Sequence, residues 1–181
     1  MVHLMRVEEE YRLELKEIRF DNLMLKQIIQ NGVPSGFQNS VIAIANVFVQ
    51  SNINAFGKMA MAGCGSYSKI EGFAFLPVTC FTMALTTFVS QNLGAKQYDR
   101  AKKGARFGVL CSITIAELIG VIIYAAAPVL IAAFNRDPDV VHYGVMQSRT
   151  IALFYCLLAF SHCIAAVLRG SGHASVPMIV M

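Results

Sequence analysis

The feature that most constrains this chain is the length of its uncharged stretches. Residues 27–57, 72–95 and 150–168 contain no Lys, Arg, Asp or Glu, and residues 107–134 contain one charge, Glu117. A bilayer core of about 30 Å needs about 20 apolar residues in a helix. A soluble domain would carry roughly a quarter charged residues, whereas this chain is 14% charged and 56% hydrophobic. The sequence therefore predicts an all-α, polytopic bundle of transmembrane helices.

Glycine, proline and polar turns divide the chain into about four spans and the start of a fifth. Gly32 to Pro34 predicts a helix start, because the missing N–H of proline is tolerated in the first turn. Pro77 predicts a kink in the second span, and Gly94 predicts its end. The predicted spans cover about 33–56, 61–93, 107–134 and 140–168, and the next span begins within 173–181.

The two ends of the chain differ from the spans between them. Residues 1–26 are charged and amphipathic, so we predict a linker on the membrane surface, whereas residues 27–181 form part of one lobe. The apolar stretch from 176 to 181 is too short to span a bilayer. The chain is therefore expected to be a truncated part of a larger protein.

The orientation of the spans follows from their basic residues. If four spans alternate, eleven of the 15 Lys and Arg residues lie on one side, in the N-terminal segment, the 96–106 loop and Arg169. Short cytoplasmic loops carry an excess of Lys and Arg. We therefore expect a multi-pass protein of the plasma (inner) membrane, with its N-terminus and its 96–106 loop in the cytoplasm.

Amides gather on one face of the first span. At 100° per residue, one arc of about 100° contains Ser35, Asn39, Asn46, Gln50 and Asn54. A lipid-facing surface gains nothing from amides, so this face is predicted to point inward. It either forms hydrogen bonds between helices or lines a water-filled cavity, and the number of amides favours the cavity.

The second span carries a similar polar stripe around Glu71. The stripe consists of Ser68, Glu71, Thr79, Thr82, Thr86 and Ser90. Hydroxyl groups can bond the carbonyl four residues earlier, so they are a weak signal by themselves. An ionised carboxylate in hydrocarbon costs at least a few kcal/mol. Glu71 must therefore face water, pair with a cation or stay protonated, and an ion or substrate role and a structural hydrogen bond both remain open.

Polar residues of the last two spans are secondary candidates. Glu117 stands alone in the third span, with Tyr124 two turns later. A line in the fourth span recurs every seven residues and consists of Ser148, Tyr155, His162 and Arg169. Single polar residues in such positions are typical of packed hydrogen bonds more often than of ion or proton pathways.

The sequence offers no enzymatic motif. It has no GxxxxGK[ST], HExxH or GxSxG pattern, and its Cys and His residues lack metal-ligand spacing. No catalytic residue, metal site, cofactor or nucleic-acid partner is therefore expected. An intramembrane enzyme that used His162 or Glu71 would need a nucleophile or a metal cluster, and the sequence has neither.

Four stretches, in order, resemble MATE (multidrug and toxic compound extrusion) transporters. Residues 69–77 followed by 83–95 resemble the eighth transmembrane helix of that family, and the 91–95 segment is fairly specific. Residues 32–36 with 54–57 resemble helix seven, residues 98–104 the cytoplasmic loop after helix eight, and residues 168–173 the end of helix ten. The resemblance covers about residues 20–181.

This resemblance implies half of a two-lobe fold that works by alternating access. It implies export of cationic, amphipathic drugs or metabolites in exchange for Na⁺ or H⁺. The partners would be the lipid bilayer, the cationic cargo, the N-terminal lobe and the last helices of the transporter. Some members carry a cation-binding acid in helix seven and another in helix ten, whereas the corresponding spans here have none. No coupling residue therefore carries over.

The predicted function is transport through a cleft between the lobes. The first span would contribute Asn39, Asn46, Gln50 and Asn54, and the second Glu71, Thr82 and Thr86. The secondary candidates are Glu117, Tyr155 and His162. A related flippase for a lipid-linked substrate is one alternative, although the stripes contain no Lys or Arg except Arg169. Another alternative is that the chain is inactive without the rest of the transporter.

Overall fold

The computed structural model describes residues 21–180, and the chain divides into two compact units between Gln30 and Asn31. In the first unit, Asp21 caps the first helix: its Oδ1 accepts a hydrogen bond from the backbone N–H of Leu23 at 2.8 Å. Residues 1–20 of the predicted linker lie outside the described part of the chain.

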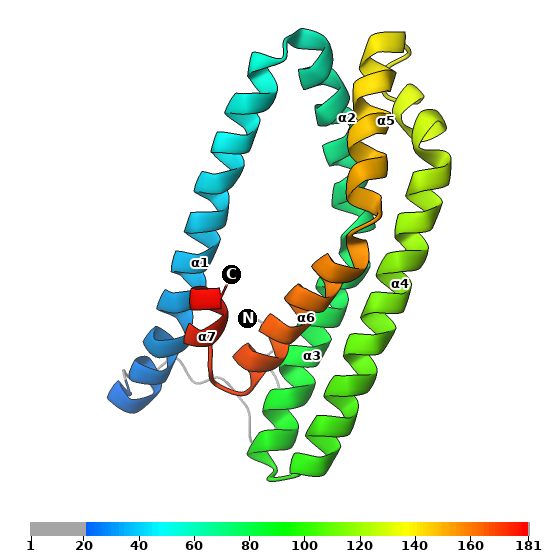
Figure 1. The fold of residues 1–181 in the computed structure, drawn as a ribbon. Helices are drawn as coiled ribbons and strands as arrows, with labels where there is room; N and C mark the ends of the chain where they lie inside the picture. The colour runs from blue at the N-terminus through cyan, green and yellow to red at the C-terminus, as the bar shows by residue number, and fades with distance from the viewer. Residues whose placement is uncertain (1–20, 181) are drawn as a thin grey trace, which may run out of the picture. The chain divides into compact units, whose positions relative to one another are not determined.

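The described residues form seven helices and no strand (Figure 1). The helices are α1 (Asn22–Ala55), α2 (Lys58–Ala74), α3 (Leu76–Gly94), α4 (Tyr98–Ala132), α5 (Pro138–Ala152), α6 (Tyr155–Gly170) and α7 (Ser175–Val180). The all-α prediction is therefore confirmed. Two of the short connections have a glycine with positive backbone φ, Gly57 (96°) and Gly172 (82°).

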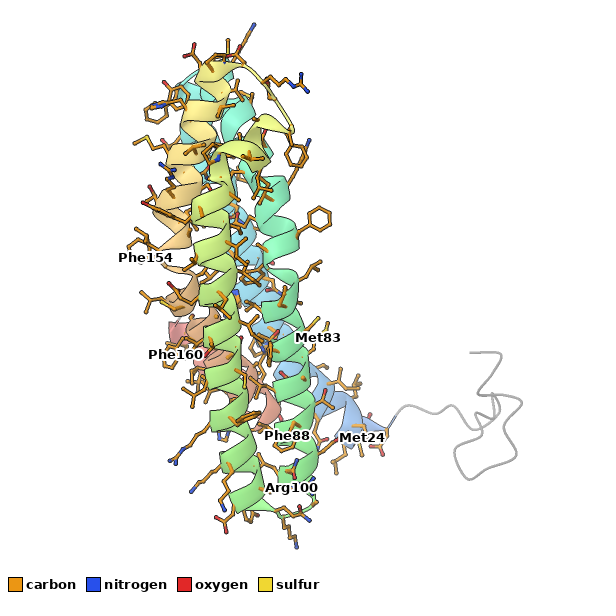
Figure 2. All side chains as sticks on the ribbon, turned by 90° about the vertical axis from the view of Figure 1, so that its right-hand side faces the viewer. Met24, Met83, Phe88, Arg100, Phe154 and Phe160 are labelled. Atoms are coloured by element: carbon orange, nitrogen blue, oxygen red, sulfur yellow. The ribbon has the colours of Figure 1, made fainter. Side chains whose placement is uncertain are left out.

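Two of the predicted spans are broken helices. α2 and α3 meet at Phe75, one turn after the carbonyl of Glu71, and Pro77 lies in the first turn of α3. Proline has no N–H to bond the carbonyl four residues earlier, so the helix cannot continue unchanged through it. α5 and α6 meet at Leu153 and Phe154 with a bend of 55°, and Figure 2 shows Phe154 pointing away from the neighbouring helices.

Length and apolar composition identify two candidate membrane spans among the described residues, Lys58–Gly94 and Tyr98–Ala132. The bent pair Pro138–Ala152 and Tyr155–Gly170 is a third if it counts as one span. α1, with 34 residues, is long enough to cross a membrane. Its recurrent amides, however, make it less apolar than the candidate spans. Four spans were predicted, and the structure sets α1 apart from the other three by its polarity.

Several helix boundaries differ from the predicted ones. α1 continues through Pro34 instead of beginning there, and α4 begins at Tyr98, so most of the predicted 96–106 loop is helical. Lys and Arg are good helix formers, so a basic segment need not be a loop. The positive φ that turns the chain after α3 belongs to Lys96 (58°), two residues after Gly94.

Small residues allow α2 to α6 to approach one another closely. α2 packs on α5, α3 packs on α4 and α6, and α4 packs on α5 and α6. A methyl group on Gly120 would lie 2.8 Å from the Ala152 carbonyl oxygen, and one on Gly170 would lie 2.7 Å from the Thr86 carbonyl oxygen. Such contacts between small residues and backbone are the usual basis of helix association in membranes.

The GxxxG pair of α4 serves packing within the chain. The ring of Phe88, labelled in Figure 2, lies over Gly104. Leu85 lies over Gly108. Because α3 fills this surface, Gly104 and Gly108 are used inside the bundle and not to pair α4 with another chain.

Candidate functional site

The predicted amides of α1 are exposed. Asn39, Asn46, Gln50 and Asn54 all lie on the surface of the described chain, and the amide Nε2 of Gln50 donates to Oδ1 of Asn54 at 3.0 Å. The buried polar residue of α1 is Gln38, next to the predicted stripe, with 6% of its surface exposed. The cleft role of the four exposed amides therefore stays a prediction.

A buried pair of tyrosines lies where the broken helices meet. Tyr67 of α2 and Tyr155, the first residue of α6, are 0% and 1% exposed, and their hydroxyl oxygens are 3.2 Å apart. Glu71, one turn after Tyr67 and half-buried, interacts through its side chain with the Tyr67 hydroxyl. Glu71 is thus the acidic end of a polar network that joins α2 to α6, and Tyr155 belongs to the same network.

The hydroxyl groups of the second-span stripe bond mainly to their own helix. Thr82 donates to the carbonyl of Thr79 at 2.7 Å, and Thr86 lies 2.8 Å from the carbonyl of Thr82. Thr86 is also 3.2 Å from the Ala166 carbonyl of α6, so it can bond across the two helices. Such local bonds satisfy hydroxyls in an apolar medium and leave their oxygens as acceptors.

Thr82 and Thr86 nevertheless face a groove. The groove has a volume of about 480 Å³, and its lining consists of Thr82, Met83, Thr86, Thr87 and Arg169. The guanidinium of Arg169 donates to the amide oxygen of Gln38 at 3.5 Å, and the Gln38 amide donates to the Pro177 carbonyl of α7 at 3.4 Å. The structure therefore brings Arg169 together with two predicted threonines.

The seven-residue line of the fourth span follows the inner side of both helix halves. Ser148 and Tyr155 are fully buried, while His162 and Arg169 are half-buried. The ring of His162 meets Phe75 edge to face, with 5.0 Å between ring centroids. His162 therefore packs against the break between α2 and α3. It contacts Phe75 there, and not the tyrosine pair.

Glu117 is set into the packed side of α4. Its Oε2 is buried and has no hydrogen-bond partner among residues 21–180. Tyr124, two turns later, lies instead under the guanidinium of Arg149, 5.2 Å from its ring centroid. Glu117 is thus separate from the Glu71 network and from the Arg169 groove.

A second cavity is apolar and lies at the other end of the helices. It has a volume of about 450 Å³, and its lining consists of Val49, Ile53, Phe56, Ala60, Cys64, Tyr143, Met146, Gln147, Thr150 and Ile151. The amide oxygen of Gln147 is buried without a hydrogen-bond partner among the described residues. None of the four predicted α1 amides lines this cavity, although apolar side chains of α1 do.

The tyrosine pair gives a first testable prediction. Replacing Tyr67 by phenylalanine is expected to lower the unfolding free energy by about 1 kcal/mol, because the hydroxyl of Tyr155 and the carboxyl of Glu71 each lose a buried partner. Tyr155→Phe should cost a similar amount, and the double variant should cost less than the sum. Unfolding by SDS, followed by circular dichroism, measures all three.

Tyr124→Phe is the matched control, since the Tyr124 ring is 43% exposed and contacts Arg149 through its face. Its unfolding free energy should stay within about 0.5 kcal/mol of the parent. Strictly additive losses in the double variant would contradict a hydrogen bond between the two tyrosines.

The sequence patterns missed Gln38, Tyr67 and Gln147 as polar residues of the interior. Tyr67 could have been found, since it precedes Glu71 by four residues and so shares its helix face. Gln38 precedes Asn39 and lies 100° from it, outside the predicted stripe. Its partner Arg169 is 131 residues away, which no local pattern reveals.

Comparison with known proteins agrees with this architecture. "Probable multidrug resistance protein YoeA" of Bacillus subtilis is 22% identical over 163 residues, covering 90% of this chain and 35% of that protein. "Probable multidrug resistance protein NorM" of Thermotoga maritima is 26% identical over 155 residues, covering 86% of this chain and 33% of that protein. A "FAD transporter" of Shewanella oneidensis is 24% identical over 138 residues, covering 76% of this chain and 30% of that protein.

A solved structure has the same fold. A MOP superfamily transporter from Pyrococcus furiosus matches 85% of this chain with a TM-score of 0.80 and 17% identity, and the match covers 34% of that transporter. The chain thus spans about a third of the length of the proteins that it matches. The MatE family model matches residues 34–181, which is most of the chain. The chain therefore belongs to the MatE family.

Proposed function

We propose that this chain is part of the C-terminal lobe of an antiporter that exports cationic, amphipathic drugs or metabolites in exchange for Na⁺ or H⁺. Membership of the MatE family and the names of the multidrug resistance relatives support export of small organic compounds. The N-terminal lobe and the last helices would come from the rest of the transporter, because the chain spans about a third of its relatives.

The network of Glu71, Tyr67 and Tyr155 is the observation that supports ion coupling best. A carboxyl group half-buried among membrane helices is a functional-site hypothesis by default, because ionising it in hydrocarbon is costly. Here it lies beside the breaks of both broken helices. Broken helices in transporters place polar groups near the bilayer midplane, where ions and substrates bind. A change in the charge of Glu71 would therefore act on α2 and α6 together.

The basic cluster after α3 supports the proposed orientation. Lys96, Arg100, Lys102, Lys103 and Arg106 are all exposed, and Figure 2 shows Arg100 at the end of the bundle. In a plasma (inner) membrane this end would face the cytoplasm, because positive charge accumulates on that side.

The coupling proposal is tested with Glu71→Gln in the full-length protein that carries this chain. Reconstituted in liposomes, the parent protein should export a cationic dye when a proton or sodium gradient is imposed. The export rate of the Glu71→Gln variant should be lower by a factor of about five or more. Glutamine keeps the shape of the side chain and a hydrogen bond, but it cannot ionise. Separate proton and sodium gradients identify the coupling ion.

Asp139→Asn is the matched control, because it makes the same carboxyl-to-amide change at an exposed position in the first turn of α5. Its export rate should equal that of the parent. Unchanged export and unchanged gradient dependence in Glu71→Gln would remove Glu71 from the mechanism.

A further inference from the structure

We propose that the groove beside Arg169 binds an anionic group, a carboxylate or a phosphate, of the molecule that the transporter carries. The inference rests on the proposed export function, and it extends the cargo from cations to amphipathic anions. Its basis is the position, charge and surroundings of Arg169, which the sequence alone had placed at the cytoplasmic end of its span.

Arg169 lies beside the middle of α3. Gly170, the next residue, packs so closely on α3 that a methyl group there would lie 2.7 Å from the Thr86 carbonyl oxygen. Thr86 precedes the end of α3 at Gly94 by eight residues, which is about 12 Å along a helix. Gly170 is the last residue of α6, which follows α5 after a bend of 55°.

Apolar and basic side chains share the surface at this level. Leu85 packs on Gly108 of α4, so the neighbouring part of α4 lies beside Thr86. There Phe107 is 71% exposed, Leu110 is 64% exposed, and the exposed Arg106 precedes them. Arg169 differs from Arg106 in being half-buried against α3, where a guanidinium needs water or a partner.

No carboxylate of the described chain compensates Arg169. None of the carboxyl groups among residues 21–180 forms an ion pair with it, and its hydrogen bond there is the 3.5 Å contact with Gln38. That contact is long and uses one of the five N–H groups of a guanidinium. His162 of α6 is close enough to Arg169 to interact with it electrostatically, and it cannot supply negative charge. The groove is therefore electropositive, and N–H groups of the Arg169 guanidinium remain available to a ligand.

The walls of the groove suit an amphipathic anion. Thr82, Thr86 and Thr87 use their hydroxyl hydrogens on carbonyls of the bundle, so the donors that face the groove come from Arg169. The planar guanidinium binds carboxylate and phosphate through two parallel hydrogen bonds. Met83, which is 69% exposed, provides an apolar wall (Figure 2). A volume of about 480 Å³ accommodates a small organic molecule.

Two dyes with one ring system test the proposal. Fluorescein is an anion and rhodamine 123 a cation, and both have a xanthene ring. In the full-length protein in phosphatidylcholine nanodiscs, fluorescence polarisation should detect fluorescein binding. Arg169→Gln should weaken fluorescein binding about tenfold or more, and Arg169→Lys should weaken it less, because a point charge remains without the paired hydrogen bonds. Rhodamine 123 binding should not weaken in either variant.

The control is Arg149→Gln, which removes an exposed arginine that contacts Tyr124 far from the groove. It should leave fluorescein binding unchanged. If Arg169→Gln fails to fold, Arg169→Lys and competition in the parent protein decide, since inorganic phosphate should displace fluorescein but not rhodamine 123. Equal fluorescein affinity in all arginine variants, or no competition by phosphate, would overturn the proposal.

Three further outcomes separate the source of the anion and the two proposals. If phosphatidylglycerol added to the nanodiscs abolishes fluorescein binding, the groove holds a lipid headgroup, and the assignment to cargo is wrong. If the transporter exports rhodamine 123 but never binds fluorescein, the export function stands and the anion site falls. If fluorescein binding depends on Arg169 but the protein has no export activity, the anion site stands and the proposed export function is wrong.

Discussion

Replacing Gly63 by alanine is expected to lower the unfolding free energy of the bundle by about 2–3 kcal/mol. A methyl group at this position would lie 2.6 Å from the carbonyl oxygen of Val140 and 2.9 Å from the backbone nitrogen of Gly144. Both are backbone atoms of α5, so no side chain can rotate away, and α2 and α5 must separate. The loss exceeds the gain of up to about 1 kcal/mol that alanine normally brings to a helix in place of glycine.

Gly65→Ala is the matched control, two residues later on α2. No atom lies within 4 Å of a methyl group placed on Gly65, which is exposed. There the helix propensity of alanine acts without a clash, so stability should rise by up to about 1 kcal/mol. Unfolding by SDS, followed by circular dichroism, compares the two variants. If both shift stability in the same direction, α2 and α5 do not approach as closely as the structure shows.

The helical class of this chain was predictable because it depends on a local property. Charge-free stretches long enough to cross a bilayer as a helix exclude most soluble folds. Pro77 predicts a kink, and the structure has the break two residues earlier, at Phe75. The break at Leu153 and Phe154 had no such signal, since neither proline nor glycine is near. It arises from packing: α5 lies on α2, whereas α6 lies on α3, and Tyr155 is buried at the turn between them.

The candidate site was predictable only where one helix determines it. The stripe of Thr82 and Thr86 was visible at 100° per residue, and these two residues do line a groove. Glu71 was visible as an isolated charge, but its link across the bundle runs through Tyr67 to Tyr155, which is 88 residues from Tyr67. Arg169 was assigned to the cytoplasmic end of a continuous fourth span, and the 55° bend between α5 and α6 was not predicted.

Replacing Glu117 by methionine is expected to raise the unfolding free energy by about 2 kcal/mol. Oε2 of Glu117 is buried and unpartnered among residues 21–180, and an unpaired buried oxygen costs about 1–3 kcal/mol. Methionine has a similar shape and removes both the charge and the polar atom. Glu117→Gln should give a smaller gain, because the amide still needs a partner. Leu118→Met, on the 58% exposed neighbour, should change little.

The same variants separate a structural Glu117 from a functional one. Proteins retain costly polar groups where activity needs them, so stability gained at such a site is often accompanied by lost function. If Glu117→Met is more stable and exports dye at the parental rate, Glu117 has no part in transport. If it is more stable but export falls, Glu117 belongs beside Glu71 as a coupling candidate, although the two do not share a network. A less stable Glu117→Met would mean that Oε2 binds a group beyond the described residues, and the expected gain would be wrong.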